Sequence, residues 1–251
     1  MTNRIISLIL STLAFLLGWD LLTRFGGLPE FILPAPLSVW TRFLTALRDG
    51  TLWEHTRVTF SEVVLGLLVG VLFATAVGYA LAKSRSLERT LSPYLVASQA
   101  IPVIAIAPLL VIWLGDGMLS KVVICALIVF FPVLVNTIVG VRAVPIALYD
   151  LMHSLHATRM QILWKVEVPA ALPVLLGGLR IGATLSVIGA IVGELVGAQS
   201  GLGFLLQIGK FQYDTPLVFV AVFTLVALAL VLYGAVTLLE QRFLKWQNNS
   251  R

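Results

Sequence analysis

Charged residues are scarce in this chain of 251 residues, where Asp, Glu, Lys and Arg together make up 12%, against about 25% in a soluble domain. Hydrophobic residues make up 59% and the mean hydropathy is +1.00. A water-soluble fold of this composition would have too few polar side chains to cover its surface. Helices that face lipid satisfy their own backbone hydrogen bonds, so we predict an all-α integral membrane protein.

Reactive and metal-binding side chains are also few. Cys125 is the single cysteine and lies inside an apolar run, which suits a small core residue and excludes an internal disulfide. The three histidines, His55, His153 and His156, lack the partner ligands of a metal site. A G-x-x-x-x-G-K-[ST] phosphate-binding loop is absent, because the only Gly-Lys pair is followed by Phe211. We predict a protein that is not an enzyme, with no catalytic or metal residues and no cofactor.

Six apolar runs approach the length of about 20 residues that a helix needs to cross a bilayer. These predicted spans are 5–22, 58–82, 93–114, 120–140, 171–197 and 216–239. The first run could instead be a signal peptide, but its length and the lack of a nearby cleavage site favour an uncleaved span. We expect residues 1–251 to form one membrane domain, a polytopic bundle of about six transmembrane helices.

Lys and Arg residues in the loops predict the orientation, because cytoplasmic loops carry an excess of them. If the N-terminus is cytoplasmic, ten lie inside and six outside, and Arg180 falls within a span. The ten are Arg4, Lys83, Arg85, Arg89, Arg142, Arg159, Lys165, Arg242, Lys245 and Arg251. The six are Arg24, Arg42, Arg48, Arg57, Lys121 and Lys210. We therefore predict both termini in the cytoplasm, and we attribute the net charge of +5 to membrane orientation rather than to nucleic acid.

The connection between the first two spans, 23–57, is long enough to fold by itself. After Pro36 it places five apolar residues on one helical face, namely Leu37, Trp40, Phe43, Leu44 and Leu47. Proline is favoured at the first position of a helix. The pattern predicts a short helix that either lies in the membrane interface or packs against the bundle.

The connection 141–170 is also long for a plain link. Its i, i+3, i+4, i+7 spacing of apolar residues predicts a short helix that contains Leu148, Leu151, Met152 and Leu155. Thr158 can cap a second short helix that extends through Trp164, and Pro169 and Pro173 close the segment before the fifth span. We expect a cytoplasmic helix–turn–helix surface for a partner, with a plain connecting loop as the alternative.

The most specific motif lies in this connection. Its first half reads Asp150-Leu151-Met152-His153-Ser154-Leu155-His156, and nine residues later it reads Val166-Glu167-Val168-Pro169. This pattern resembles the EAA loop of binding-protein-dependent ABC transporter permeases, E-A-A-x-x-x-G followed by nine residues and I-x-L-P. Asp150 stands in place of the Glu, and His156 in place of a Gly that normally permits a turn with positive φ.

Further motifs agree with this resemblance from about Leu33 to Trp246. They are Leu33-Pro34-Ala35-Pro36, Ile101-Pro102, Ala107-Pro108-Leu109, Trp113-Leu114-Gly115, Phe131-Pro132, Asn136-Thr137, Gly140-Val141-Arg142, Gly178-Leu179-Arg180, Gly193-Glu194 and Gly201-Leu202-Gly203. The chain is most similar to the branch that carries sulfonates, taurine and nitrate. Similar permeases serve the uptake of vitamins or pyrimidine precursors.

The resemblance implies a type I ABC importer permease in the cell membrane, surrounded by lipid. It implies a second permease copy that completes a homodimer, a dimer of separate ABC ATPase subunits that hydrolyse ATP, and a solute-binding protein that selects the substrate. The residues that it assigns to ATPase coupling are Asp150, Leu151, Met152, Leu155, His156, Ala157 and Pro169.

Charged residues within or near the spans are candidates for a translocation path. Charge at membrane depth is costly and marks interior pathways, and Glu62, Arg180 and Glu194 lie there. We take Arg180 and Glu194 as path candidates, with helix packing or a membrane-interface role as the alternative. Pro102 and Pro108 break the third span, either as a cavity-lining irregularity or as a kink repaired by its neighbours.

Two other functions are open from the residues alone. An ion-coupled secondary transporter would show buried acidic relays and often an internal repeat. A membrane-embedded enzyme would place clusters of His, Asp or Glu near a membrane face. Neither pattern is clear in this sequence.

Overall fold

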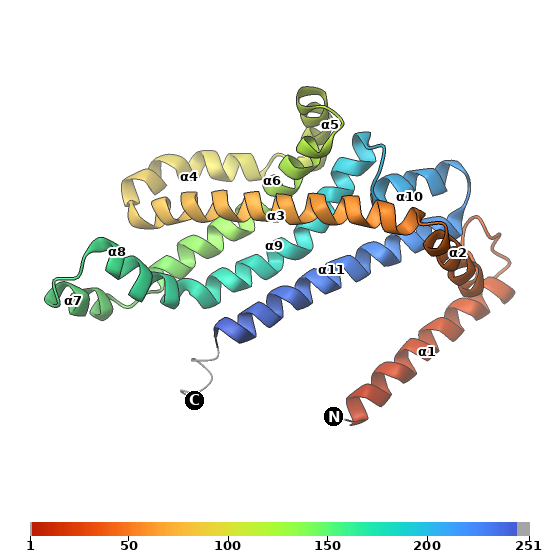
Figure 1. Cartoon of the computed structure of the whole chain (residues 1–251), viewed down its shortest axis with the longest axis horizontal. Coiled ribbons are helices and arrows are strands. Elements are labelled where there is room, and N and C mark those ends of the chain that lie inside the picture. The colour runs from red at the N-terminus through yellow and green to blue at the C-terminus, as the bar shows by residue number, and fades with distance from the viewer. Residues whose placement is uncertain (1, 245–251) are drawn as a thin grey trace. The chain divides into compact units, whose positions relative to one another are not determined.

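The computed structural model describes residues 2–244, and within them the secondary structure is entirely helical (Figure 1). The elements are α1 (Thr2–Phe25), α2 (Pro36–Arg48), α3 (Thr51–Lys83), α4 (Arg85–Gln99), α5 (Val103–Leu114), α6 (Met118–Arg142), α7 (Ile146–Ser154), α8 (Arg159–Ile162), the π-helix η1 (Leu163–Glu167), α9 (Val168–Gly197), α10 (Leu202–Phe211) and α11 (Thr215–Phe243). The all-α class predicted from composition is confirmed.

Four helices of the described part are long and apolar enough to cross a membrane. They are α3, α6, the continuous stretch Arg159–Gly197 that ends in α9, and α11. The pair α4 and α5 adds a fifth if it is counted as one broken span. The first predicted span, 5–22, lies inside α1 (Thr2–Phe25), and its passage through the membrane stays a prediction.

The third predicted span, 93–114, is not one straight helix. α4 and α5 meet at an angle of 92° across a short break. Pro102 stands at the break as the extended N-cap of α5, with φ −68° and ψ 121°. A proline lacks the N–H that would continue the helix, and it disfavours helical geometry in the residue before it, here Ile101. Pro108 lies inside α5 and does not end it.

The described residues divide into two compact units, 2–58 with 199–226, and 59–198 with 227–244. In the first unit Trp19 contacts segments that are far apart in the sequence. Its indole donates a hydrogen bond to the Pro34 carbonyl at 3.0 Å and stacks on Phe219, with ring centroids 5.5 Å apart. Arg42 of α2 forms an ion pair with Asp214 at 2.7 Å. These contacts connect α1, α2 and the start of α11.

Helix α2 begins at Pro36, as predicted, and buries Val39 and Ala46. The predicted apolar face is exposed at Leu37, Trp40 and Leu47 and half-buried at Phe43 and Leu44. Leu37 is 70% exposed and Trp40 is 56% exposed. An interfacial helix needs such an apolar face free to enter the lipid headgroup region, and a position in the membrane interface and packing against the bundle both stay predictions for α2.

In the second unit α3, α6 and α9 approach one another closely through glycines. A Cβ atom at Gly66 of α3 would overlap the Cβ of Cys125, and one at Gly189 of α9 would lie 2.7 Å from the Cα of Cys125. Cys125 of α6 is fully buried between them. Small residues allow this kind of backbone approach in membrane helices, where van der Waals contact replaces hydrophobic driving force.

Gly66→Ala is therefore expected to destabilise the second unit by about 1–3 kcal/mol, the usual cost of overpacking a tight contact. The backbone carbonyl of Val122 also lies 3.0 Å from the added Cβ, so side-chain movement alone cannot relieve the clash. Gly234→Ala is the matched control, because nothing lies within 4 Å of its Cβ position. Thermal unfolding of both variants in detergent tests this, and equal midpoints would contradict the packing.

Candidate functional site

The segment 141–170 forms a helix, a tight turn and a second helix. Pro145 is the extended N-cap of α7, and Ser154 is its last residue. Thr158 then caps α8 with a capping box, in which its hydroxyl accepts from the N–H of Gln161 and its own N–H donates to the Gln161 side chain. This arrangement satisfies backbone donors that the start of a helix would otherwise leave free. The predicted N-cap at Thr158 is confirmed.

The turn between α7 and α8 depends on a left-handed residue. His156 has φ 54°, so it takes the conformation that the family's glycine would supply. The N–H of Ala157 bonds to the Met152 carbonyl at 2.9 Å, and the N–H of His156 bonds to the His153 carbonyl at 2.9 Å. These two bonds form a Schellman motif, which usually carries glycine at this position.

His156→Gly is expected to raise the stability of this turn by a fraction of the about 1–2 kcal/mol that a side chain costs in left-handed geometry. The greater freedom of glycine in the unfolded chain removes part of the gain. His153→Gly is the control, since His153 is helical within α7 and its replacement should lower stability. Midpoints of thermal unfolding test the pair, and a lower midpoint for His156→Gly would refute the strain.

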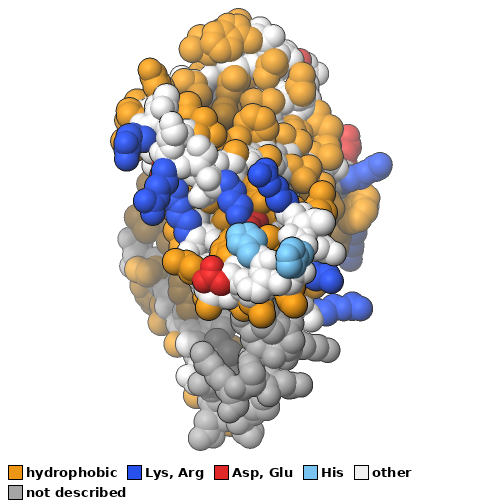
Figure 2. Space-filling view, turned by 90° about the vertical axis from the view of Figure 1, so that its left-hand side faces the viewer, with side chains coloured by type: hydrophobic (Ala, Val, Ile, Leu, Met, Phe, Trp, Pro, Cys, Tyr) orange, Lys and Arg blue, Asp and Glu red, His pale blue; other side chains and the backbone are white. Residues whose placement is uncertain are grey.

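Apolar side chains of the predicted coupling face are exposed. Leu151 is 55% exposed and Leu155 is 67% exposed, whereas Met152 is half-buried. Asp150 lies beside them on the exposed surface of α7, and Ala157 is half-buried in the turn. Figure 2 looks onto this end of the chain, where hydrophobic side chains lie next to histidines and a group of Lys and Arg. Leu151 and Leu155 are therefore not buried against other helices of the described chain.

The sequence suggested that the second short helix ends at Trp164. In the structure the helix continues beyond this residue. α8 continues without a break through the π-helix η1 into α9, and Pro169 and Pro173 lie within the first turns of α9. In the π-turn the N–H of Val168 bonds to the Leu163 carbonyl, one residue further back than in an α-helix. Pro169 has no N–H to donate, and the wider turn accommodates that missing bond. The exposed loop is thus directly continuous with a membrane-spanning helix.

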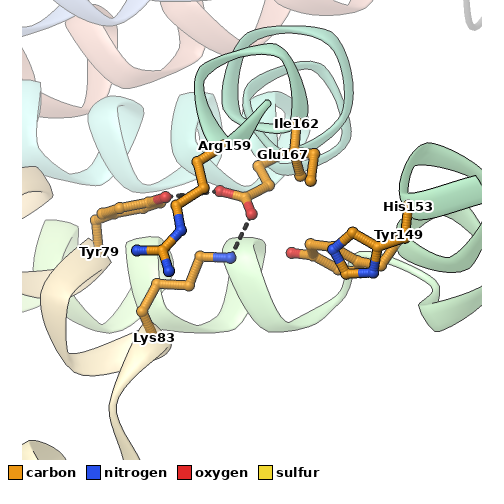
Figure 3. Close-up of a pocket in the computed structure, with 7 residues that line it drawn as sticks. All are labelled: Tyr79, Lys83, Tyr149, His153, Arg159, Ile162 and Glu167. Carbon is orange, nitrogen blue, oxygen red and sulfur yellow. Dashed lines mark hydrogen bonds and ion pairs between the residues drawn. The ribbon is translucent and has the colours of Figure 1, made fainter. Parts of the chain in front are cut away.

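Glu167 connects this loop to the rest of the second unit. This residue is almost fully buried, with 3% of its side chain exposed. It accepts a hydrogen bond from the Tyr79 hydroxyl at 2.8 Å and forms an ion pair with Lys83 (Figure 3). The Lys83 ammonium also lies 5.0 Å from the ring centroid of Tyr149 in α7. Burial raises the pKa of the Tyr149 hydroxyl, and the negative charge of Glu167 acts in the same direction. The Glu167 carboxylate of η1 therefore holds two side chains of α3, and one of these, Lys83, contacts α7 through Tyr149.

Glu194, a predicted path residue, lies in a buried polar cluster. It is fully buried and accepts a hydrogen bond from the Thr59 hydroxyl at 2.6 Å. Glu62 and Lys121 are also buried, at 3% and 1% exposure. Lys121 donates to the Gly197 carbonyl at 2.8 Å, so it is part of α6 packing rather than of an outer loop. The cluster joins α3, α6 and α9, and a path-lining role for Glu194 stays a prediction.

Arg180, the other predicted path residue, has partners in α11. It forms an ion pair with Glu240, and its guanidinium lies 5.4 Å from the ring centroid of Tyr233. An ion pair between two helices reduces the cost of holding charge in a span. Arg180 therefore connects α9 to α11 in the second unit, and a direct role in the path stays a prediction.

Arg180→Ala and Glu194→Gln are expected to reduce uptake more than Arg48→Ala does. Each of the first two removes a charge from an interhelical contact, and Arg48 is an exposed residue in the last turn of α2. Uptake is compared at equal membrane abundance. Full uptake by both span variants would reject a functional role for these charges, and lost abundance would assign them to helix packing.

The fold and these contacts define a multi-pass helical membrane protein with an exposed, motif-bearing loop built onto one of its spans. Residues 66–245 match the model of the family described as binding-protein-dependent transport system inner membrane component. The chain belongs to this family. It is the permease subunit of an ABC importer, a membrane transport subunit and not an enzyme.

Individual proteins agree with this assignment. The chain is 44% identical to the riboflavin transport system permease protein of Chloroflexus aurantiacus, over 92% of this chain and 87% of that protein. It is 32% identical to the taurine transport system permease protein of Escherichia coli, over 97% and 91%. The inward-facing MetNI methionine ABC transporter has the same fold, with a TM-score of 0.62 and 24% identity over 80% of this chain and 97% of that chain. The predicted resemblance to ABC permeases, including the taurine branch, is confirmed.

Proposed function

We propose that two copies of this chain form the translocation path of an ATP-driven importer and that the 141–170 loop docks on a separate ATPase subunit, which hydrolyses the ATP. Both termini and this loop lie in the cytoplasm in this proposal. The observation that carries it is the exposure of Leu151 and Leu155 on a loop that is continuous with a span. Large apolar side chains held at a surface mark interaction sites when they gather in one patch.

The contacts of the loop supply a route for force. Movement of α7 by the ATPase would shift Tyr149, which packs against the Lys83 ammonium. Lys83 and Glu167 would pass that shift to α3, and η1 would pass it to α9 because no break separates the two. Two spans of the second unit would then tilt together, which would open the path to one side of the membrane and close it to the other.

The energy available for docking is moderate. Burial of Leu151, Met152 and Leu155 contributes about 1.5–3 kcal/mol for each side chain before costs. Association entropy consumes much of this sum. Asp150 adds a negative charge in the exposed loop, which suits a basic side chain of the ATPase. A contact of this strength can transmit force. It is also weak enough that the loss of any one of the three apolar side chains should impair docking.

We propose a vitamin-type solute as the cargo, delivered by a binding protein. The support is the higher identity to the riboflavin permease, 44%, than to the taurine permease, 32%. The test is uptake into proteoliposomes that contain the permease, its ATPase and its binding protein. Labelled riboflavin and labelled taurine are compared with and without ATP. Uptake of riboflavin that needs ATP supports the proposal, uptake of taurine alone would change the substrate class, and uptake without the ATPase would refute the mechanism.

A further inference from the structure

A cavity of about 480 Å³ lies beneath the helix–turn–helix loop. Its walls come from the end of α3, from α7, from α8 and from η1 (Figure 3). The lining residues are Tyr79, Lys83, Tyr149, His153, Arg159, Ile162 and Glu167. Its volume falls in the range of about 300–1,000 Å³ that is typical of small-molecule sites. The proposed docking face uses other side chains, while Tyr149, Lys83 and Glu167 of the cavity also belong to the proposed route for force.

The charges around the cavity do not balance. Glu167 is its only acidic residue, and Lys83 and the Tyr79 hydroxyl already occupy that carboxylate. Arg159 and His153 also line the cavity, and within residues 2–244 their side chains have no hydrogen-bond or ion-pair partner. In the close-up the Arg159 side chain extends into the cavity toward Lys83, while His153 lies beside Tyr149 on the opposite wall (Figure 3). The Arg159 guanidinium and the His153 imidazole are therefore available to a ligand.

This donor set suits a tetrahedral oxyanion. The guanidinium of Arg159 offers a planar fork of N–H donors that matches two phosphate oxygens. His153 on the facing wall can donate to a third oxygen, and Lys83 keeps the one carboxylate of the cavity paired. A neutral ligand would make no use of the Arg159 charge, which is exposed to solvent when the cavity is empty. A cation would meet Arg159 and Lys83 with no free carboxylate to hold it.

We propose that the cavity binds a phosphate group, with Arg159 as its principal ligand and His153 as the second. The group has two possible sources. One is the headgroup of an anionic phospholipid, because the cavity lies at the ends of α3 and of the helix that continues into α9, both membrane-spanning. Basic pockets between membrane helices bind such headgroups. The other source is a free phosphate compound from solution.

Isothermal titration of the full-length purified chain in neutral detergent tests this proposal. The ligands are dihexanoyl phosphatidylglycerol, inorganic phosphate, and zwitterionic dihexanoyl phosphatidylcholine as the control lipid. We expect phosphatidylglycerol to bind and phosphatidylcholine not to bind. Arg159→Gln should weaken binding by about tenfold or more, since it removes a charge-assisted bidentate contact. Arg89→Gln should leave the affinity unchanged, because Arg89 is exposed in α4 and does not line the cavity.

Binding of phosphatidylglycerol without binding of inorganic phosphate identifies a lipid site, and binding of both identifies a site for the phosphate group itself. Either result supports the proposal when it depends on Arg159. Absence of binding, equal binding of both lipids, or equal losses in Arg159→Gln and Arg89→Gln would overturn it. If Arg159→Gln unfolds, His153→Gln is measured instead, with a several-fold loss expected, and an unchanged affinity there would also overturn the site.

Discussion

Leu151→Asp is expected to abolish uptake while the permease stays in the membrane at normal abundance. Leu151 is 55% exposed in the described chain and lies outside the spans, so its replacement by Asp disturbs neither the core nor membrane insertion. Docking on the ATPase would instead bury the new carboxylate against an apolar surface. An unpaired buried charge costs several kcal/mol, which exceeds what the remaining contacts of the loop supply.

Three quantities are measured for this variant: membrane abundance, co-purification of the ATPase, and uptake. Ser154→Asp is the matched control, because it adds the same charge to the same helix without removing an apolar contact, and Ser154 is exposed. We expect Ser154→Asp to keep most of the uptake. Normal uptake and normal ATPase retention in Leu151→Asp would reject the coupling role, whereas lost abundance would show that the face packs on the permease itself.

Lys83→Met is expected to lower the stability of the second unit by about 3 kcal/mol, the low end for a broken buried ion pair. The variant leaves Glu167, 2% exposed, with the Tyr79 hydroxyl but without its cation. Lys83 itself is partly exposed, with 39% of its side chain accessible, which is why the low end applies. The loop should also lose its contact through Tyr149, so uptake should fall together with stability.

The double variant Lys83→Met with Glu167→Gln separates the effect on stability from the effect on uptake. The introduced glutamine is neutral and its side-chain carbonyl can still accept from Tyr79, so the double variant should regain most of the lost stability. Thermal unfolding of the unmodified protein, of Lys83→Met, of Glu167→Gln and of the double variant gives the coupling energy between Lys83 and Glu167 directly. A coupling energy near zero would show that the ion pair adds nothing. Recovered stability with uptake still absent would assign the pair to force transmission as well as to folding.

The sequence predicted the class of fold and the helix–turn–helix within 141–170 well. Composition alone required lipid-facing helices, and the spaced motifs located the loop at 141–170. The substitution of His156 for glycine was also informative, because its φ of 54° shows that the turn keeps the geometry of the motif with a different residue. Local patterns such as caps, turns and apolar periodicity depend on near neighbours, and those are visible in a sequence.

Contacts between distant residues were not predictable in this way. Glu167 occupies an unspecified position of the I-x-L-P pattern, and its partners Tyr79 and Lys83 lie more than eighty residues away. Lys121 was assigned to an outer loop, yet it is buried in α6 beside Glu194 and Glu62. The only available signal was an acidic residue in an otherwise apolar stretch, and such a signal does not name its partner.

Photo-crosslinking from position 151 is the most direct test of ATPase docking through this loop. A benzophenone amino acid replaces Leu151 in the full-length chain, and membranes are irradiated with the assembled transporter present. The control position is Ile188, which is 49% exposed on the spanning helix α9. We predict a crosslink from 151, but not from 188, to a protein that carries the G-x-x-x-x-G-K-[ST] phosphate-binding loop. Crosslinks from 151 only to the permease or to lipid, in a preparation that shows ATP-dependent uptake, would contradict docking through this loop.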